Sequence, residues 1–245
     1  SLALVLNEIG WRISVLKGGY KNYRKLVLDE LDDLGKYQFK ILQGQTGSAK
    51  TKILNCLNNM NAQVIDLENL ACHRGSLLGS EINRKQHSQR YFESLLHNTI
   101  DKFDCTKPIF IESESSKIGK LHLPKKLWLK LNESDRLLLN VPIDERIKFL
   151  LKEYKHLTKD CKLIQPFISG MKGKIANEQL SNWRILIQRK EWGNFVKEIL
   201  ENHYDPKYSF AAMKHNNKIK HKIDVMKLNK LSIENTSKKI LEYFN

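Results

Sequence analysis

The sequence predicts an α/β fold: a parallel sheet with flanking helices, followed by a helical, basic C-terminal region. Three observations support this prediction. From residue 39 onward, short apolar runs alternate with loops and with segments of helical apolar spacing, the order found in parallel sheets with crossover helices. A loop with two glycines, a lysine and a threonine separates the first apolar run from the first helical segment. After residue 142 the apolar spacing is mostly helical.

The expected sheet and its helices occupy residues 36–142. Short apolar runs predict strands at residues 39–43, 63–67, 108–113 and 136–141. Helical spacing predicts one helix over residues 50–60 and a long amphipathic helix over residues 84–103. Because strands and helices alternate, the strands are expected to run parallel.

Residues 143–245 are expected to form a helical cap and a basic tail of the same domain. Apolar side chains form helical faces in residues 143–154 and 183–199. In the tail, lysines interleave with apolar residues over 219–228. The tail is therefore expected to fold onto the domain and to present its charge outward.

Residues 1–30 look like an attachment to this domain. Apolar spacing predicts a first helix that ends at Gly10, and an alternating run at residues 12–16 predicts a strand, followed by a Gly-Gly turn. These pieces cannot enclose a core. The segment is either an appendage or the remnant of another domain, and the acidic residues 29–33 are the expected link.

The formal net charge of +15 and the pI of about 9.6 favour a polyanionic partner. Nucleic acid is preferred over membrane phospholipid, because the sequence has no amphipathic stretch with aromatic anchors. The tail is the most basic part, and the expected RNA contacts are Lys214, Lys218, Lys220 and Lys222.

Composition argues against several protein classes. The apolar runs are too short to span a bilayer and no export signal opens the sequence, so a cytoplasmic protein without a membrane partner is expected. The four cysteines form no CxxC pair and no zinc-ligand pattern, so reduced thiols are expected. Cys72 is expected to be a small core residue rather than a nucleophile.

One loop carries the strongest chemical signal. It reads Gly44, Gln45, Thr46, Gly47, Ser48, Ala49, Lys50 and Thr51. This is the spacing of a P-loop, apart from Ala49 in place of the last glycine, and it predicts a P-loop NTPase-like fold. Its N–H groups are expected to bind phosphate, with Lys50 neutralising oxygens and Thr51 binding phosphate or Mg²⁺. Ala49 is expected to crowd the ligand, and the alternative is an ordinary turn with a surface lysine.

Polar residues after two other strands are candidate partners of this loop, since the carboxyl ends of parallel strands meet at one edge. Glu112 and Glu114 could hold Mg²⁺ or act as a base, or they could be solvated loop charges. His73 could exchange a proton and Arg74 could clamp a phosphate. Packing or capping roles for this His-Arg pair are equally open.

Several segments together resemble one family. They are the loop, Asp66-Leu67-Glu68 with His73-Arg74-Gly75-Ser76, Glu112-Ser113-Glu114-Ser115 with Ile118-Gly119 and Leu123-Pro124, and His203-Tyr204-Asp205-Pro206 with Tyr208. In this order, over most of the chain, they resemble tRNA 2-selenouridine synthase. The loop alone is generic, whereas the complete set is specific.

The resemblance implies action on the wobble uridine of tRNA. A 2-thiouridine is S-geranylated from geranyl diphosphate, and selenophosphate then replaces the sulfur with selenium. The implied site has a diphosphate at the loop and Mg²⁺ near Glu112 or Glu114, with the anticodon arm on the basic surface. Its catalytic residues would be Lys50, His73, Arg74, Glu112 and Glu114.

The family also joins a rhodanese domain to its P-loop domain. Residues 10–24 resemble the end of the rhodanese domain, so residues 1–30 are expected to be its C-terminal remnant. The family's rhodanese cysteine precedes the helix that starts here at Ser1. We therefore expect a fragment, or a split enzyme in which a separate rhodanese chain supports the selenium-transfer step.

Two other functions remain open from the sequence. A P-loop NTPase or small-molecule kinase would bind a nucleotide with the same loop, Mg²⁺ and acidic strand end, although it has no need of the +15 charge. A non-catalytic tRNA-binding fragment would bind tRNA tightly without turnover.

Overall fold

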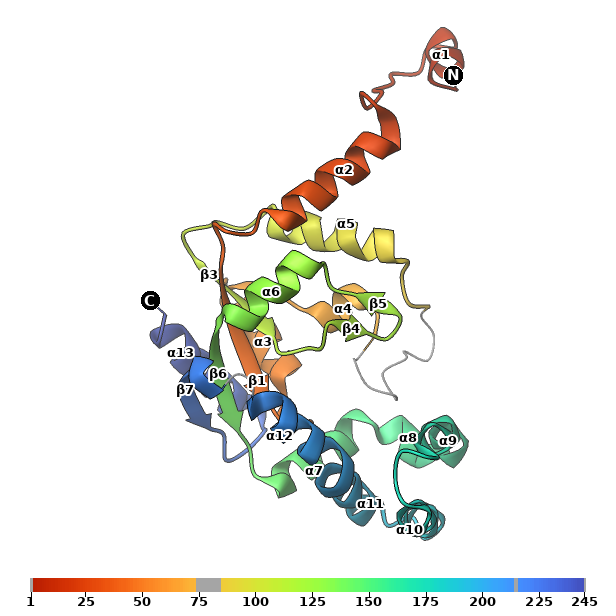
Figure 1. Ribbon diagram of the computed structural model, residues 1–245, viewed down its shortest axis with the longest axis vertical. Coiled ribbons are helices and arrows are strands. Elements are labelled where there is room, and N and C mark those ends of the chain that lie inside the picture. The colour runs from red at the N-terminus through yellow and green to blue at the C-terminus, as the bar shows by residue number, and fades with distance from the viewer. Residues whose placement is uncertain (1, 74–84, 214–215, 245) are drawn as a thin grey trace.

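A parallel sheet forms the centre of the computed structural model, which describes residues 2–73, 85–213 and 216–244. The sheet has five strands in the order β2-β3-β1-β6-β7, and each neighbouring pair is parallel. Figure 1 shows the sheet between layers of helices, with further helices beyond the end of β1. The predicted P-loop NTPase-like α/β fold is confirmed.

Four of the five strands of the sheet correspond to predicted apolar runs, although β2 ends at Ile65 rather than at Leu67, and β7 was not predicted. The five strands are β1 (Gln38–Gly44), β2 (Gln63–Ile65), β3 (Pro108–Glu112), β6 (Asp135–Asn140) and β7 (Ile219–Asp224). The helices beside them are α2 (Gly19–Asp32), α3 (Lys50–Asn59), α4 (Leu67–Ala71), α5 (Gln89–Ile100), α6 (Lys125–Glu133) and α13 (Lys230–Glu242).

Helices cover both faces of the sheet, and this burial explains why the first four strands read as continuous apolar runs. On one face, Leu42 and Leu137 belong to a core that includes Ile53 of α3 and Ile240 of α13. On the other face, α2, α5 and α6 enclose a second core around Ile41. Side chains of the loops at the carboxyl ends of the strands are left free to face a ligand.

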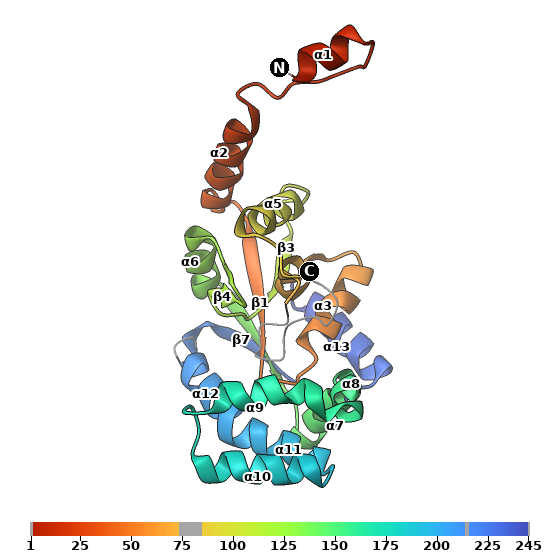
Figure 2. The ribbon, with the colours of Figure 1, turned by 90° about the vertical axis from the view of Figure 1, so that its right-hand side faces the viewer.

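The cap consists of short helices packed around aromatic side chains. They are α7 (Ile143–Glu153), α8 (Lys155–Lys159), α9 (Gln165–Met171), α10 (Asn177–Gln188), α11 (Trp192–Ile199) and α12 (Asp205–Met213). Trp183 is fully buried in a third core, where it stacks on Phe167 and meets Phe195 edge-on. Figure 2 shows these helices at the end of the sheet that is opposite α1. The helical cap is confirmed.

The N-terminal segment differs from its prediction. The first helix is present as α1 (Leu2–Glu8), but residues 12–16 form no strand, and the expected turn and acidic link lie in and around one helix, α2. A strand needs a neighbouring strand for its N–H and C=O groups, and residues 12–16 have none among the residues that the structure describes. Val27 and Leu31 anchor α2 in the main core, whereas α1 projects from the body (Figure 1).

The basic tail forms a strand and a helix, β7 and α13, where no strand was expected. β7 pairs with β6 at the edge of the sheet. Ile223 joins the core beneath α13, and His221 stacks on Tyr243 with ring centroids 4.0 Å apart. Lys220 and Lys222 alternate with these residues and are exposed, so the prediction of outward-facing charge is confirmed.

A few smaller elements were not anticipated. They are α6 and the two-stranded hairpin of β4 (Lys117–Ile118) and β5 (Leu121–His122). The long helix expected over residues 84–103 is α5, and its expected first residue lies outside the described part of the chain. Among the described helices, none combines the length and the apolar character needed to cross a bilayer.

Candidate phosphate-binding active site

The P-loop joins β1 to α3, as its spacing predicts. α3 begins at Lys50, so the N–H groups of its first turn face the loop. Gly47 has a φ of 85° and Ala49 a φ of 58°, both in the left-handed region. A Cβ at Gly47 would lie 3.0 Å from Leu150 and 3.2 Å from Arg146, so this position requires glycine. Ala49 adopts the conformation that glycine would favour and is 5% exposed.

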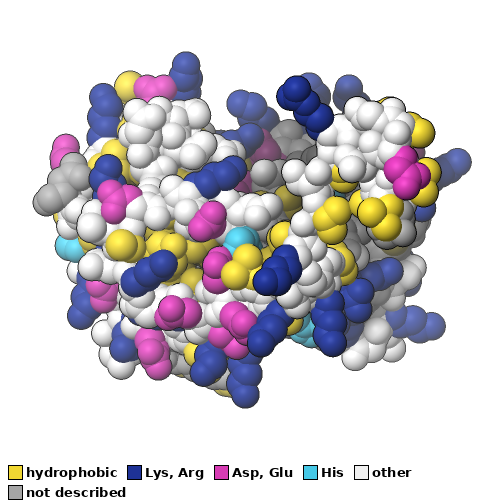
Figure 3. Space-filling view, turned by 90° about the horizontal axis from the view of Figure 1, so that it is seen from above, with side chains coloured by type: hydrophobic (Ala, Val, Ile, Leu, Met, Phe, Trp, Pro, Cys, Tyr) yellow, Lys and Arg dark blue, Asp and Glu magenta, His cyan; other side chains and the backbone are white. Residues whose placement is uncertain are grey.

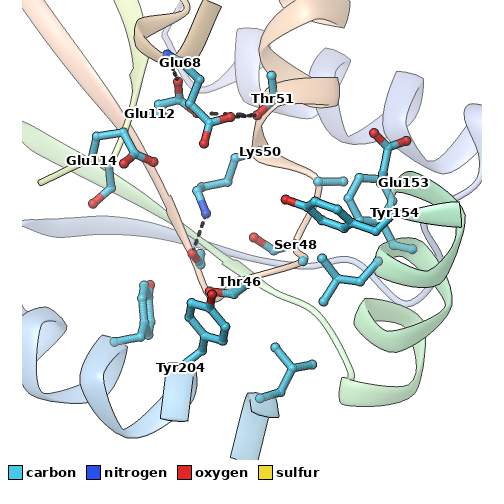
Figure 4. Close-up of a pocket in the computed structure, with 18 of the residues that line it drawn as sticks. Thr46, Ser48, Lys50, Thr51, Glu68, Glu112, Glu114, Glu153, Tyr154 and Tyr204 are labelled. Carbon is cyan, nitrogen blue, oxygen red and sulfur yellow. Dashed lines mark hydrogen bonds between the residues drawn. The ribbon is translucent and has the colours of Figure 1, made fainter. Parts of the chain in front are cut away.

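The side chains of the loop are placed to bind an anion and a cation. Lys50 Nζ donates a hydrogen bond to the Gly44 carbonyl oxygen at 2.8 Å, which holds the ammonium group inside the loop (Figure 4). Ser48 Oγ is buried and has no hydrogen-bond partner in the described structure, so a phosphate oxygen would satisfy it. Thr51 Oγ1 lies 3.3 Å from Glu68 Oε2 and 3.5 Å from Glu112 Oε2.

Three carboxylates meet beside Thr51. Oxygens of Glu68, Glu112 and Glu114 all lie within 4.8 Å of one another. Burial, and then the charge of Glu68, raises the pKa of Glu112 well above its ordinary value and that of Glu114 to about 7. Carboxylates this close need a proton or a cation between them, and oxygen ligands suit Mg²⁺. Glu112 and Glu114 were both predicted as possible Mg²⁺ ligands, and the geometry adds Glu68 as a candidate.

Glu68 is the candidate site residue that the sequence analysis did not select. Asp66 caps α4 by accepting a hydrogen bond from the Asn69 N–H at 2.9 Å, and burial raises the pKa of Asp66. The Glu68 N–H in turn donates to Glu112 Oε1 at 3.2 Å. The cap thus fixes the first turn of α4 against β3. An acidic residue in the first turn of a helix after a parallel strand was the signal that could have identified Glu68.

Mg²⁺ binding is expected to strengthen as the pH rises from about 6 to about 8. Because the pKa of Glu114 is raised to about 7 and that of Glu112 is raised as well, the metal-free cluster holds protons at the lower pH, and a cation must displace them. Titration calorimetry with Mg²⁺ at both pH values measures the effect. Glu112→Gln should abolish most of the binding at either pH, and equal affinity of the unaltered chain at both would contradict the assignment.

The His73 side chain is not part of this carboxylate cluster, although the His73 N–H donates to the Glu68 carbonyl oxygen at 3.0 Å. His73 Cδ2 would be 2.8 Å from a Cβ at Gly119, and burial lowers the pKa of His73. Cys72 is buried, as expected of a small core residue, with Sγ 3.2 Å from His87 Nε2. Arg74, like Lys214 of the tail, lies outside the described residues. Catalytic roles for His73 and Arg74 therefore stay predictions.

A cavity of about 980 Å³ opens beside the loop and joins two unlike surfaces. At one end lie the loop and the three carboxylates. At the other end the cap supplies apolar side chains, among them Phe149, Leu157, Phe167, Val196 and Ile199. In Figure 4, Tyr154 and Tyr204 lie on the other side of Lys50 from Glu112. The cavity can hold a ligand with a phosphorylated head and an apolar body.

A buried ion pair attaches the cap to the loop. Both terminal nitrogens of Arg146 donate to the two carboxylate oxygens of Asp205 at 2.8 Å. Arg146 Nη1 also donates to the Thr46 carbonyl oxygen at 3.3 Å. This geometry gives Asp205, part of the His-Tyr-Asp-Pro segment, a structural role that the sequence did not assign.

Comparison with known proteins agrees with the motifs. Residues 37–172 match the family described as tRNA 2-selenouridine synthase AAA domain. Three similar proteins are named tRNA 2-selenouridine synthase. The one from Psychromonas ingrahamii is 24% identical over 86% of this chain and 64% of its own length. The one from Marinobacter nauticus is 37% identical over 61% of this chain and 40% of its own length. The one from Sulfurovum sp. is 30% identical over 87% of this chain and 65% of its own length.

The chain matches only part of the length of each relative. The chain spans at most 65% of the length of these three relatives. A solved structure of shikimate kinase from Bacteroides thetaiotaomicron aligns with 84% of the chain and 97% of its own at 11% identity, but its TM-score of 0.38 supports no functional conclusion. The family match covers residues 37–172, more than half of the sequence, so the chain belongs to the tRNA 2-selenouridine synthase AAA domain family.

Proposed function

We propose that this chain is the part of a tRNA-modifying transferase that S-geranylates a 2-thiouridine at the wobble position. The observation that carries the proposal is the single cavity in which the P-loop and carboxylates adjoin an apolar cap. Geranyl diphosphate has the matching form, with a charged diphosphate and a ten-carbon apolar chain. The family name and the net charge of +15 support tRNA as the second substrate.

The residues of the cavity suit the bond changes of this transfer. The uridine sulfur would attack the first carbon of the geranyl group, forming a C–S bond while the C–O bond to the diphosphate breaks. The electron pair passes to the diphosphate, where loop N–H groups and Lys50 stabilise the charge. Mg²⁺ on Glu68, Glu112 and Thr51 would supply further charge neutralisation. The N3 proton of the base is lost to solvent or to a cluster carboxylate, and the cap excludes water from the allylic carbon.

The experiment that tests this function incubates the chain with tRNA containing 2-thiouridine, geranyl diphosphate and Mg²⁺, followed by nucleoside mass spectrometry. The proposal expects S-geranyl-2-thiouridine from the unaltered chain and none from Lys50→Ala. A parallel reaction measures ATP hydrolysis. ATP turnover with unmodified tRNA would instead establish the NTPase or kinase alternative, and tight tRNA binding without either product would establish a non-catalytic fragment.

The replacement of sulfur by selenium is a separate part of the proposal. It requires selenophosphate, and we assign it to a rhodanese-type domain, on the same polypeptide or on a separate chain. Adding selenophosphate to the geranylated product tests this assignment. Accumulation of geranylated tRNA without 2-selenouridine is expected from the P-loop domain alone, whereas 2-selenouridine formed by this chain would contradict the assignment.

The tRNA surface is proposed to include Lys220 and Lys222 of β7, together with Lys218, which directly precedes that strand. Lys220 and Lys222 are exposed, Lys218 is half-buried, and Lys218 and Lys220 help to lower the pKa of Asp135. Replacing all three with glutamine should weaken tRNA binding and reduce the slope of log Kd against log salt by about 2, because each phosphate contact releases counterions. Filter binding over a salt series measures it. A control with Lys230, Lys238 and Lys239 of α13 replaced should keep the slope, and an unchanged β7 variant would place the RNA elsewhere.

A further inference from the structure

In the described part of the chain, two arginines are buried near the P-loop, and only one of them is paired with a described carboxylate. Arg146 is 3% exposed and pairs with Asp205 through two hydrogen bonds. Arg136, near the start of β6, is 4% exposed and forms no ion pair with any carboxylate in the described part of the chain. A buried charge without a partner is costly, so this guanidinium calls for an anion that the described residues do not supply.

The contacts that Arg136 makes are few and long. Nη1 lies 3.5 Å from Gln43 Oε1 and 3.4 Å from Ser113 Oγ, and Nη2 lies 3.4 Å from the Leu131 carbonyl oxygen. All three acceptors are neutral, and Nε has no hydrogen-bond partner among the described residues. Burial lowers the pKa of Arg136, which agrees with the lack of a nearby carboxylate. These bonds position the guanidinium without satisfying its donors.

The groups around Arg136 line the same cavity as the loop and are mostly able to donate. Gln43, Ser113, Arg136 and Tyr208 all face it. Tyr208 Oη is buried and forms no hydrogen bond of good geometry with the described residues. Burial raises the pKa of Tyr208, although the Gln43 side chain and the Arg136 guanidinium lie close enough to lower it in opposition. A guanidinium, a phenol and a hydroxyl that reach one space from three elements, β6, α12 and the end of β3, suit an anion with several acceptor oxygens. A tetrahedral phosphate offers these oxygens, whereas a carboxylate offers only two.

We propose that Arg136 and Tyr208 form a second anion subsite of the cavity, which binds a small phosphate-type oxyanion separately from the group held in the P-loop. The inference goes beyond the proposed function, in which the P-loop holds the one diphosphate group, and it rests on the contacts and burial of Arg136 and Tyr208. An anion here lies beside Ser113, the residue that follows β3, in the cavity that the P-loop and the three carboxylates also line. The subsite thus brings a second phosphate-type anion into the cavity that holds the phosphorylated ligand of the loop.

Counting bound inorganic phosphate by equilibrium dialysis tests the subsite. The unaltered chain should bind two phosphate ions at saturation, and Arg136→Met and Lys50→Ala should each bind one. Arg184→Met, which removes an exposed charge from α10, should still bind two. Tyr208→Phe should weaken one site about tenfold or more, since it removes a hydrogen bond to a charged group. Comparing Arg136→Met with Lys50→Ala distinguishes a failure of this subsite from a failure of the loop, because each variant alters one of the two sites.

Thermal unfolding provides a second readout. Arg136→Met should melt at the same temperature as the unaltered chain, or higher, without phosphate, because it removes an uncompensated buried charge. It should also lose part of the stabilisation that phosphate gives. The proposal is overturned if Arg136→Met still binds two phosphate ions, or if the unaltered chain binds only one. It is also overturned if Arg136→Met binds tRNA more weakly while its phosphate binding is unchanged. If Arg136→Met does not fold, unchanged phosphate binding by Tyr208→Phe overturns it equally.

Discussion

Lys50→Ala is expected to reduce the affinity for diphosphate on the order of 100-fold. The substitution removes the charge-assisted hydrogen bond from the Lys50 ammonium group to the diphosphate, in a cavity from which the ligand displaces water. The fold should survive, since within the described residues the Lys50 ammonium group donates one hydrogen bond, to the Gly44 carbonyl oxygen, at 2.8 Å. Titration calorimetry with inorganic diphosphate and Mg²⁺ measures the loss.

The matched control for this prediction is Lys126→Ala, which removes an exposed lysine from α6. Its diphosphate affinity should equal that of the unaltered chain. If Lys50→Ala binds diphosphate as tightly as the control, the phosphate-binding role of the loop is wrong. If both variants lose affinity alike, the effect comes from net charge rather than from the loop.

Asp205→Ala is expected to destabilise the fold by about 3–5 kcal/mol, since it leaves Arg146 buried without its partner. The lost pair joins α7 to α12 beside the loop, so diphosphate affinity should fall as well. Urea denaturation measures the free energy of unfolding. Asp224→Ala, at an exposed aspartate of β7, should cost much less.

A double variant separates an unpaired charge from lost packing. Arg146→Met combined with Asp205→Leu replaces the ion pair with apolar side chains of similar size, and it should recover much of the stability lost in Asp205→Ala. Recovery without diphosphate binding would show that the pair orients the loop. A loss below about 1 kcal/mol in Asp205→Ala would contradict the structural role assigned to the pair.

The features that were predicted best are those determined by residues close to one another along the chain. The strand, loop and helix from Gln38 to Asn59 follow from apolar periodicity and from the spacing of Gly44, Gly47 and Lys50. Glu112 was predicted because a strand of a parallel sheet ends there. The charge of the tail faces outward as its alternation with apolar residues indicated.

The features that sequence missed depend on distant partners. Glu68 joins the carboxylate cluster through contacts with Thr51 and Glu112, and Arg146 meets Asp205 only after the cap folds. β7 was missed because its lysines interrupt the apolar run, although an edge strand accepts them on its open side. Residues 12–16 alternate as a strand would, but no strand in the described part of the chain pairs with them.

The most direct test of the account compares geranyl diphosphate with inorganic diphosphate in one calorimetric series. If the cap holds the prenyl chain while the loop holds the diphosphate, the unaltered chain should prefer geranyl diphosphate on the order of 100-fold, from buried apolar area. Val196→Asp, at a half-buried position on the cavity wall, should lose this preference, and Val196→Thr should keep most of it. Equal affinity of the unaltered chain for both ligands would contradict the claim that the cavity is built for a prenyl diphosphate.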